Sequence, residues 1–271
     1  MPAATDPRLK ECSALAFYGI DPGPEAAERF YKTVVGWFDD LGHPPDKLSV
    51  GGPGQSGKLG AFSRGNGKLL KEGFANVSYF DVVATLPEAQ IFGRDYYLIA
   101  GENREPNRLV ASVVARSSLA GLTPESLLPL ARVLAEVLRP AYGVGFRREH
   151  ALGPELYVLG VNKGQNAAMS GEAYEEKLNV SRWGDLGMPR QVYRQGLLRD
   201  VFPWNFLTAP LLDRPLGPGS LAEWIRKDER RGVLGPVSDG VSLWQVPESS
   251  IPAVRRELRE AGAVFDWKKF V

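Results

Sequence analysis

Strand-like and helix-like segments come in clusters along this sequence, and this order limits the folds open to it. Three strand patterns follow one another at 76–85, 94–100 and 108–116, rich in Val, Tyr, Phe and Ile and separated by turn residues. Such a run predicts an antiparallel meander, because parallel strands need a long crossover between them. Strands and helices do not alternate strictly, as a doubly wound sheet would require. The sequence therefore predicts an α+β fold, with antiparallel sheets and helices packed on one face.

The other segments add helices and strands on either side of the meander. Residues 42–73 are rich in Gly and Pro, which predicts a long irregular excursion. The capping-box spacing of Ser220 and Glu223 predicts a helix that ends at Gly232. The remaining predicted helices cover 24–41, 123–139 and 251–262, and the remaining predicted strands cover 13–20, 142–147, 155–161, 233–238 and 241–246.

The size of the chain fits one large domain or two small ones. Its 271 residues are enough to bury a sizeable core without disulfides or metals. The polar, small-residue segment 163–171 is the best candidate boundary, although nine residues also suit a surface loop. We therefore expect a single domain over 1–271, with two lobes, 1–164 and 165–271, as the alternative.

Composition and charge exclude several functional classes. The chain has 33 Lys and Arg against 32 Asp and Glu, a net charge of +1, which gives no field to attract nucleic acid. The basic run 226–231 contains two acids and suits a solvated helix end. No apolar stretch approaches the ~20 residues of a membrane span, and 1–10 lacks the apolar run of a signal peptide. We expect a cytoplasmic protein without nucleic-acid or membrane partners.

Metal, cofactor and hydrolase signatures are weak. Cys12, His43 and His150 are too few for a structural zinc site, and no serine has glycine at both flanking second positions. The 52–58 segment, GPGQSGK, matches both the phosphate-loop and the dinucleotide patterns. A phosphate site needs a strand before the loop and a helix immediately after it, and Leu59 stands where Ser or Thr is required. The sequence predicts no cofactor, no metal and no catalytic residue.

The least regular region is 182–215, where aromatic and arginine side chains are interleaved. Such an irregular segment has the composition of a protein-interface hot spot, while the alternative is a loop whose aromatics plug the core. Trp204 itself suits the core, whereas its charged neighbours suit an interface. The candidate binding residues are Arg199, Asp200, Trp204, Trp183 and Arg190.

The C-terminal third also carries a family resemblance. The segments RWG at 182–184, RDVFPWNFL at 199–207 and LAEWI at 221–225 are similar to a group of uncharacterised bacterial proteins, some of which are predicted immunity proteins of polymorphic toxin systems. Residues 67–70 and 142–146 resemble the same group. The resemblance implies neutralisation of a cognate toxin by tight binding, without chemistry. Immunity proteins that block basic nucleases are commonly acidic, so a charge of +1 argues against a nuclease partner.

The sequence thus predicts a protein-binding module whose partner is a toxin or an assembly component. Two alternatives remain at this point. One is an enzyme with a cleft lined by Arg and carboxylate groups, and the other is a structural component of a bacterial assembly.

Overall fold

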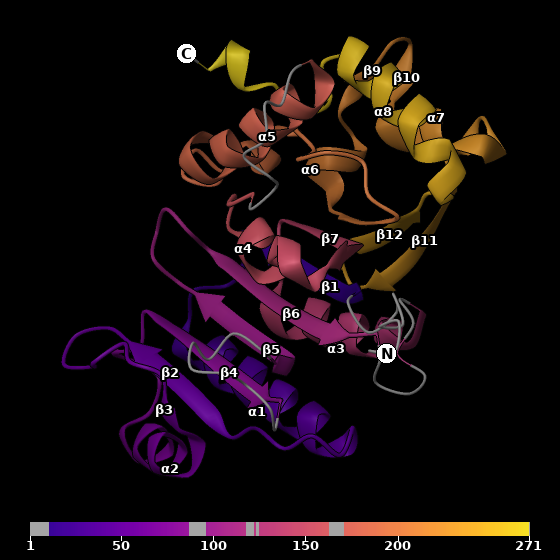
Figure 1. Cartoon of the computed structure of the whole chain (residues 1–271). Coiled ribbons are helices and arrows are strands. Elements are labelled where there is room, and N and C mark those ends of the chain that lie inside the picture. Colours follow the sequence, from indigo (N-terminus) through magenta and orange to yellow (C-terminus); the bar gives the residue numbers. More distant parts are fainter. Residues whose placement is uncertain (1–10, 87–95, 118–121, 123–124, 163–170, 271) are drawn as a thin grey trace, which may run out of the picture.

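The computed structural model describes residues 11–86, 96–117, 122, 125–162 and 171–270 (Figure 1). A ten-stranded sheet runs through the molecule, and every pair of neighbouring strands in it is antiparallel. The strand order is β11-β12-β8-β7-β1-β6-β5-β4-β2-β3. The strands are β1 (Glu11–Tyr18), β2 (Lys47–Gly51), β3 (Gly60–Ala61), β4 (Tyr79–Thr85), β5 (Tyr96–Asn103), β6 (Val110–Arg116), β7 (Tyr142–Glu149), β8 (Trp204–Leu207), β11 (Val233–Ser238) and β12 (Val241–Gln245). The predicted α+β class is confirmed.

The α-helices are spread along the chain between the strands, and one short hairpin lies apart from the main sheet. The helices are α1 (Pro24–Asp40), α2 (Phe62–Glu72), α3 (Leu128–Leu138), α4 (Pro154–Val158), α5 (Glu172–Arg182), α6 (Ala209–Leu212), α7 (Leu221–Arg226) and α8 (Ile251–Glu260). The hairpin pairs β9 (Pro215–Leu216) with β10 (Gly219–Ser220). The predicted capping box of Ser220 and Glu223 is confirmed, with both hydrogen bonds formed.

The strand β1 lies in the middle of the sheet, between β6 and β7. Its apolar run reads as a strand that is buried on both faces. Leu15 and Phe17 pack on one side, whereas Ala16 and Tyr18 pack on the other. The strands β8, β12 and β11, which follow residue 171, extend the same sheet beyond β7.

One face of the sheet is covered by α1 and α3. Helix α1 buries an apolar side that includes Phe30, Val34 and Phe38, as its helical spacing predicts. Helix α3 ends at Leu138, and Arg139 follows in the left-handed conformation. Both helices contribute to one apolar cluster with the strands beneath them. Helices α1 and α3 therefore bury one face of the β4-β5-β6 meander.

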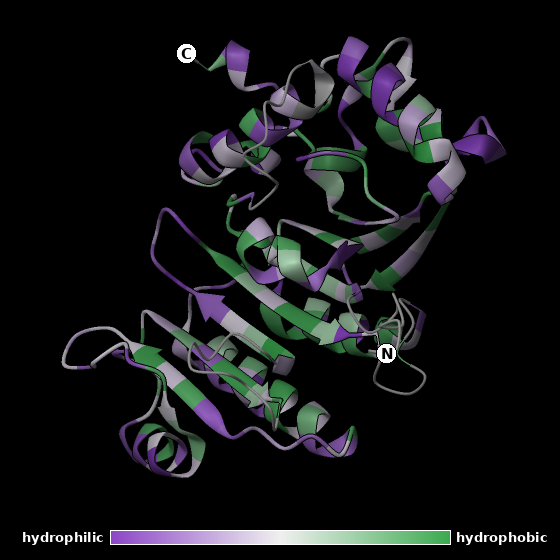
Figure 2. Ribbon diagram, in the orientation of Figure 1, coloured by the Kyte–Doolittle hydropathy of each residue, from purple (hydrophilic) through white to green (hydrophobic). Residues whose placement is uncertain are grey.

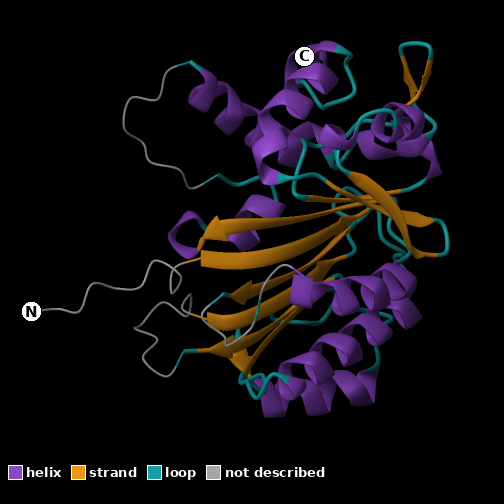
Figure 3. Cartoon of the chain, turned by 90° about the vertical axis from the view of Figure 1, so that its right-hand side faces the viewer, coloured by secondary structure: helices purple, strands orange, loops and turns teal. Residues whose placement is uncertain are grey.

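The second face is covered only in part, which corrects the expectation that the helices pack on one face. Helix α4 and the C-terminal helices pack against β1, β7 and β8, so helices lie on both sides of the strands (Figure 3). The strands are mostly apolar, while α7 and α8 carry hydrophilic residues outward (Figure 2). Strands β2, β4, β5 and β6 extend beyond this cover, and a pocket opens on their face. Helices cover both faces near β1 because this strand has apolar side chains on both faces, and each face must be shielded from water.

The prediction that 42–73 is irregular is wrong. Strand β2, the short strand β3 and helix α2 all lie within it. Gly65 and Gly67 lower the intrinsic helix propensity of α2, and only Leu69 of this helix is buried, so the sequence carries little helical signal. Tertiary contacts also stabilise α2, including a hydrogen bond from the Tyr31 hydroxyl to Asn66 Oδ1 at 2.9 Å.

The prediction of a strand at 155–161 is also wrong, because Pro154–Val158 forms helix α4. Pro154 occupies the first helical turn and Gly153 precedes it with a positive φ of 58°. Five residues are too few for a helical period to be read from sequence. The candidate boundary at 163–171 lies, except for Gly171, outside the described residues.

Candidate functional site

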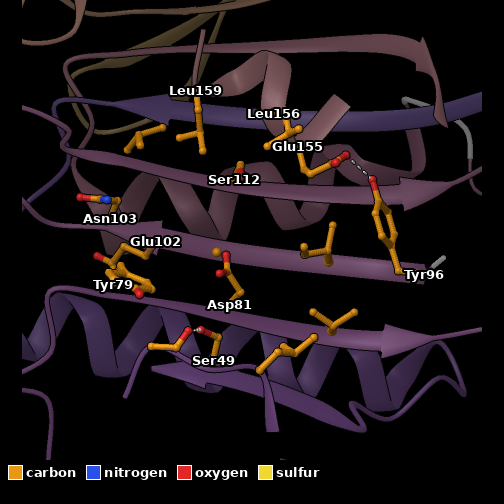
Figure 4. Close-up of a pocket in the computed structure, with 16 residues that line it drawn as sticks. Ser49, Tyr79, Asp81, Tyr96, Glu102, Asn103, Ser112, Glu155, Leu156 and Leu159 are labelled. Carbon is orange, nitrogen blue, oxygen red and sulfur yellow. Dashed lines mark hydrogen bonds between the residues drawn. The ribbon is translucent and has the colours of Figure 1, made fainter. Parts of the chain in front are cut away.

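A pocket of about 450 Å³ lies on the uncovered face of β2, β4, β5 and β6 (Figure 4). We call it the sheet pocket. Its floor is the sheet, its upper wall is α4, and the loop between β2 and β3 forms part of its rim. It is lined by Ser49, Gly57, Leu59, Tyr79, Asp81, Val83, Tyr96, Ile99, Gly101, Glu102, Asn103, Val110, Ser112, Glu155, Leu156 and Leu159.

The register of the strands explains which side chains reach the sheet pocket. Ser49, Asp81, Gly101 and Ser112 are cross-strand partners in one row across β2, β4, β5 and β6. Residues opposite one another in a ladder project from the same face. This row therefore places one carboxylate and two hydroxyls on the floor, with Asp81 in the middle (Figure 4).

Glycines make room for the larger side chains of the floor. A Cβ atom at Gly101 would lie 2.3 Å from Asp81 Oδ1, and one at Gly51 would lie 2.0 Å from the Tyr79 ring. Side chains at these positions would push Asp81 and Tyr79 out of place. Gly57 has a φ of 66°, and a Cβ there would lie 2.4 Å from the Tyr79 hydroxyl. The glycines thus fix the shape of the sheet pocket.

Asp81 is the carboxylate at the centre of the sheet pocket. Its side chain has no hydrogen bond or ion pair with any described residue, although it is half-buried. Burial disfavours the charged form, and this raises the pKa of Asp81 from 3.8 to about 6. At neutral pH the pocket therefore holds a mostly ionised, poorly solvated carboxylate that none of the described residues pairs with.

Three other polar side chains of the sheet pocket are hydrogen-bonded within the protein. The Tyr96 hydroxyl donates to Glu155 Oε2 at 2.8 Å, and the Ser49 hydroxyl donates to the Gly57 carbonyl at 3.0 Å (Figure 4). No Lys, Arg or His is found among the described residues that line the pocket. The site is therefore acidic, and its Asp81 carboxylate has no partner in the described part of the chain.

Glu102 is a second unusual carboxyl group at the edge of the sheet pocket. Its cross-strand partners are Phe80 and Ala111, which belong to the apolar cluster under α1. It is 3% exposed, and neither oxygen has a hydrogen-bond partner in the described part of the chain. Burial raises the pKa of Glu102 from 4.5 to about 8, while Arg104 opposes this rise and Asp21 adds to it. The carboxyl is mostly protonated at pH 7.

The pH dependence of stability should reveal this buried acid. A carboxyl whose pKa is raised on folding stabilises the protein below its ordinary pKa, and this contribution is lost as pH rises through about 8. We expect Glu102→Gln to match the parent near pH 5 and to exceed it by about 1 to 3 kcal/mol above pH 9. Urea unfolding of both proteins across this pH range measures the difference. A constant difference would contradict a raised pKa.

The structure places Trp183 and Arg199 together inside the protein. Arg199 is 4% exposed and Trp183 is fully buried. The Arg199 guanidinium donates to the Tyr18 hydroxyl and to the carbonyls of Tyr157 and Val158, at 2.6, 2.6 and 3.3 Å respectively. Its central carbon lies 4.4 Å from the Tyr157 ring centroid and 5.8 Å from that of Trp183. This pair ties the C-terminal region to β1 and α4.

Asp200 and Trp204 are buried as well, but they lie elsewhere. Asp200 Oδ1 accepts from Arg255 Nε at 2.7 Å, which links it to α8. Trp204 is 5% exposed and packs on Gly145 of β7. Of the five candidate binding residues only Arg190 is exposed, and its Nη1 donates to the Phe270 carbonyl at 3.2 Å. The five do not form one surface patch, and their role in binding a partner stays a prediction.

The glycine-rich loop is the turn of a hairpin. Gly57 N donates to the Val50 carbonyl, and Gln55 N donates to the Gly52 carbonyl, both at 3.0 Å. A strand does precede the loop, and a helix does follow, which the sequence did not predict. Helix α2 begins at Phe62, however, after the strand β3 that pairs with β2. The loop amides are thus not continuous with the first turn of α2, as a phosphate loop requires.

Two further sequence expectations concern metals and membranes. Within the described ranges, no group of three or more His, Cys, Asp or Glu side chains is placed to hold a metal ion. Cys12 Sγ lies 3.9 Å from His150 Nδ1, and burial raises the pKa of the Cys12 thiol to about 12. Of the helices that the structure describes, none has the length and apolar character to cross a bilayer.

Sequence reasoning missed Asp81 and the sheet pocket around it. One signal was available, namely an aspartate in the middle of the otherwise apolar strand β4. Its opposite residue, Gly101, cannot be identified until the register of β4 and β5 is known. The contribution of α4 was hidden because that segment was predicted to be a strand.

Comparison with known proteins identifies a fold and no family. No protein-family model matches the sequence, and no curated protein matches it. Among solved structures, the chain is similar to the Pseudomonas aeruginosa T6SS protein PA0821, with a TM-score of 0.58 and 12% sequence identity. The alignment covers 92% of this chain and 72% of that chain. At this identity the likeness establishes that the two proteins share a fold.

Proposed function

We propose that this protein is a protein-binding module of a bacterial secretion or toxin system, and that it acts as an immunity protein. It neutralises a cognate toxin by tight binding, without catalysing a reaction. The observation that carries the proposal is the sheet pocket, an open face of the sheet with exposed leucines at its rim and, at its centre, a carboxylate that no described residue pairs with.

The rim has the character of an interface. Leu59, from the loop before β3, is 44% exposed, and Leu159, after α4, is 36% exposed. Val161 follows at 47% exposed. Side chains that surround a binding hot spot exclude water from it, and these apolar side chains can do so at the sheet pocket. Similarity to a T6SS protein adds support at the level of the fold.

The alternative enzyme with a cleft lined by arginine and carboxylate groups has less support. A carboxyl with a pKa of about 6 suits a general acid or base. However, the described lining of the sheet pocket includes no arginine, and the second carboxylate, Glu155, is hydrogen-bonded to Tyr96. A binding role explains the exposed leucines, whereas a catalytic role does not require them.

Protection from a toxin tests the proposal. The product of the neighbouring gene in the native host is expressed in a heterologous bacterium, with and without this protein. We expect growth to be restored only by co-expression. We also expect the two purified proteins to form a stoichiometric complex with a Kd in the nanomolar range, and a Kd of 1 nM corresponds to a binding free energy of about −12 kcal/mol.

A variant that blocks the sheet pocket supplies the control. Ser112→Phe places a ring on the pocket floor, and it should abolish protection while the protein remains folded. Normal growth inhibition despite co-expression, together with the absence of a complex in isothermal titration calorimetry, would overturn the immunity function. If the Ser112→Phe variant protects as well as the parent, the binding surface lies outside the sheet pocket.

A further inference from the structure

We propose that the sheet pocket receives a single lysine or arginine side chain of the protein partner, with its charged end against the Asp81 carboxylate. This inference rests on the proposed protein-binding function and specifies its chemistry. It follows from the shape of the pocket, from its unbalanced charge and from its rim.

The walls of the sheet pocket fit the aliphatic part of such a side chain. Val83, two residues after Asp81 on β4, and its cross-strand partner Ile99 line the floor. Leu156 of α4 lines the opposite wall (Figure 4). Lysine and arginine bury their methylene stems on apolar surfaces while the charged group reaches a polar partner. A volume of about 450 Å³ is enough for one long side chain together with ordered water.

The charge of the sheet pocket selects a cation. Asp81 has no partner among the described residues, and the described lining contains no base. Of the other two acids in that lining, Glu155 accepts a hydrogen bond from Tyr96, and Glu102 is mostly protonated at pH 7. A carboxylate in a poorly solvated site is stabilised most by an opposite charge that donates hydrogen bonds. Ser112, the cross-strand neighbour of Gly101, offers a hydroxyl oxygen on the same row as an additional acceptor.

The rim indicates that the cation belongs to a protein. The exposed side chains of Leu59 and Leu159 flank the sheet pocket from two separate elements. A free metal ion or a small amine would leave both leucines in water. A protein surface that carries a basic side chain would cover them and remove the ion pair from solvent. In such a buried pair, removal of either charge lowers the affinity strongly.

The test compares two variants with the parent in binding the purified toxin of the growth assay. Asp81→Asn keeps the size of the side chain and removes its charge, and we expect it to weaken the Kd by ~30-fold or more. Asp39→Asn is the matched control, because Asp39 is an exposed carboxylate on α1, behind the sheet. This variant should change the Kd by less than ~2-fold. Melting curves establish that both variants are folded.

A second arm needs no partner. The parent is titrated by NMR with N-acetyl-arginine methylamide and with the uncharged analogue N-acetyl-citrulline methylamide. We expect saturable shifts of the Asp81 and Gly101 amide signals with the arginine probe. Neither the citrulline probe nor the Asp81→Asn variant should give them. Calcium chloride at the same ionic strength distinguishes a metal site, and a calcium response that exceeds the arginine response would overturn the proposal.

The outcomes separate this inference from the proposed function. Growth protection with equal affinity of the parent and Asp81→Asn would refute the Asp81 contact and leave the immunity function intact. Failure of protection together with saturable arginine binding would refute the immunity function and retain a cation-binding pocket. A loss of affinity in Asp39→Asn as large as that in Asp81→Asn would show that net charge alone matters, and it would overturn the inference.

Discussion

Replacing Arg199 with alanine is expected to lower the free energy of unfolding by about 3 to 5 kcal/mol. The guanidinium is buried, and it donates to the Tyr18 hydroxyl and to two carbonyls of α4. Truncation leaves these acceptors unsatisfied in a buried site and opens a cavity beside Tyr157. Urea denaturation followed by tryptophan fluorescence measures the loss.

Two further substitutions make this test specific. Arg190→Ala is the control, because Arg190 is exposed, and it should cost no more than ~0.5 kcal/mol. Arg199→Lys keeps the charge but cannot make the forked set of hydrogen bonds. Its loss of unfolding free energy should therefore be smaller than that of Arg199→Ala and larger than that of Arg190→Ala. A loss below ~1 kcal/mol for Arg199→Ala would show that the guanidinium does not hold α4 to β1.

Replacing Trp204 with alanine is expected to cost about 3 to 5 kcal/mol of folding stability. Trp204 is 5% exposed in β8, and a Cβ atom at Gly145 of β7 would lie 3.0 Å from its ring. The ring also meets the edge of Phe206, with centroids 6.5 Å apart. Removing it opens a cavity at the joint between β7 and β8.

The melting temperature and the affinity for the toxin should be measured on the same Trp204→Ala protein. The control is Leu70→Ala, because Leu70 is 50% exposed on α2 and its truncation should change stability by less than ~0.5 kcal/mol. An unchanged melting temperature combined with lost binding would assign Trp204 to the interface and not to the core.

Arg199 and Asp81 are two charged residues on the same side of the sheet, and they have different roles. Arg199 is buried and makes three hydrogen bonds through its two terminal nitrogens, so it stabilises the structure. Asp81 is half-buried and has no partner in the described part of the chain. An unsatisfied charge lowers stability in the free protein, and it is retained at functional sites because a ligand can satisfy it.

The sequence by itself determined the elements whose signal is local. The apolar run of β1, the amphipathic α1, the meander β4-β5-β6 and the capping box of α7 each depend on residues close together in the chain. Periodicity and capping report such contacts directly. The α+β class follows from their order, so it could be predicted without any structure.

Only the tertiary structure decided where the site lies and what the irregular segment does. Asp81, Gly101 and Ser112 come together through strand register, and α4 reaches them from residues more than forty positions away. Trp183, Arg199 and Trp204 of the 182–215 segment, which has an interface composition, are buried because other elements pack over them, whereas Arg182, Arg190 and Arg194 are exposed. Burial depends on which elements pack over a residue, and the sequence gives the type of the residue but not the elements that pack over it.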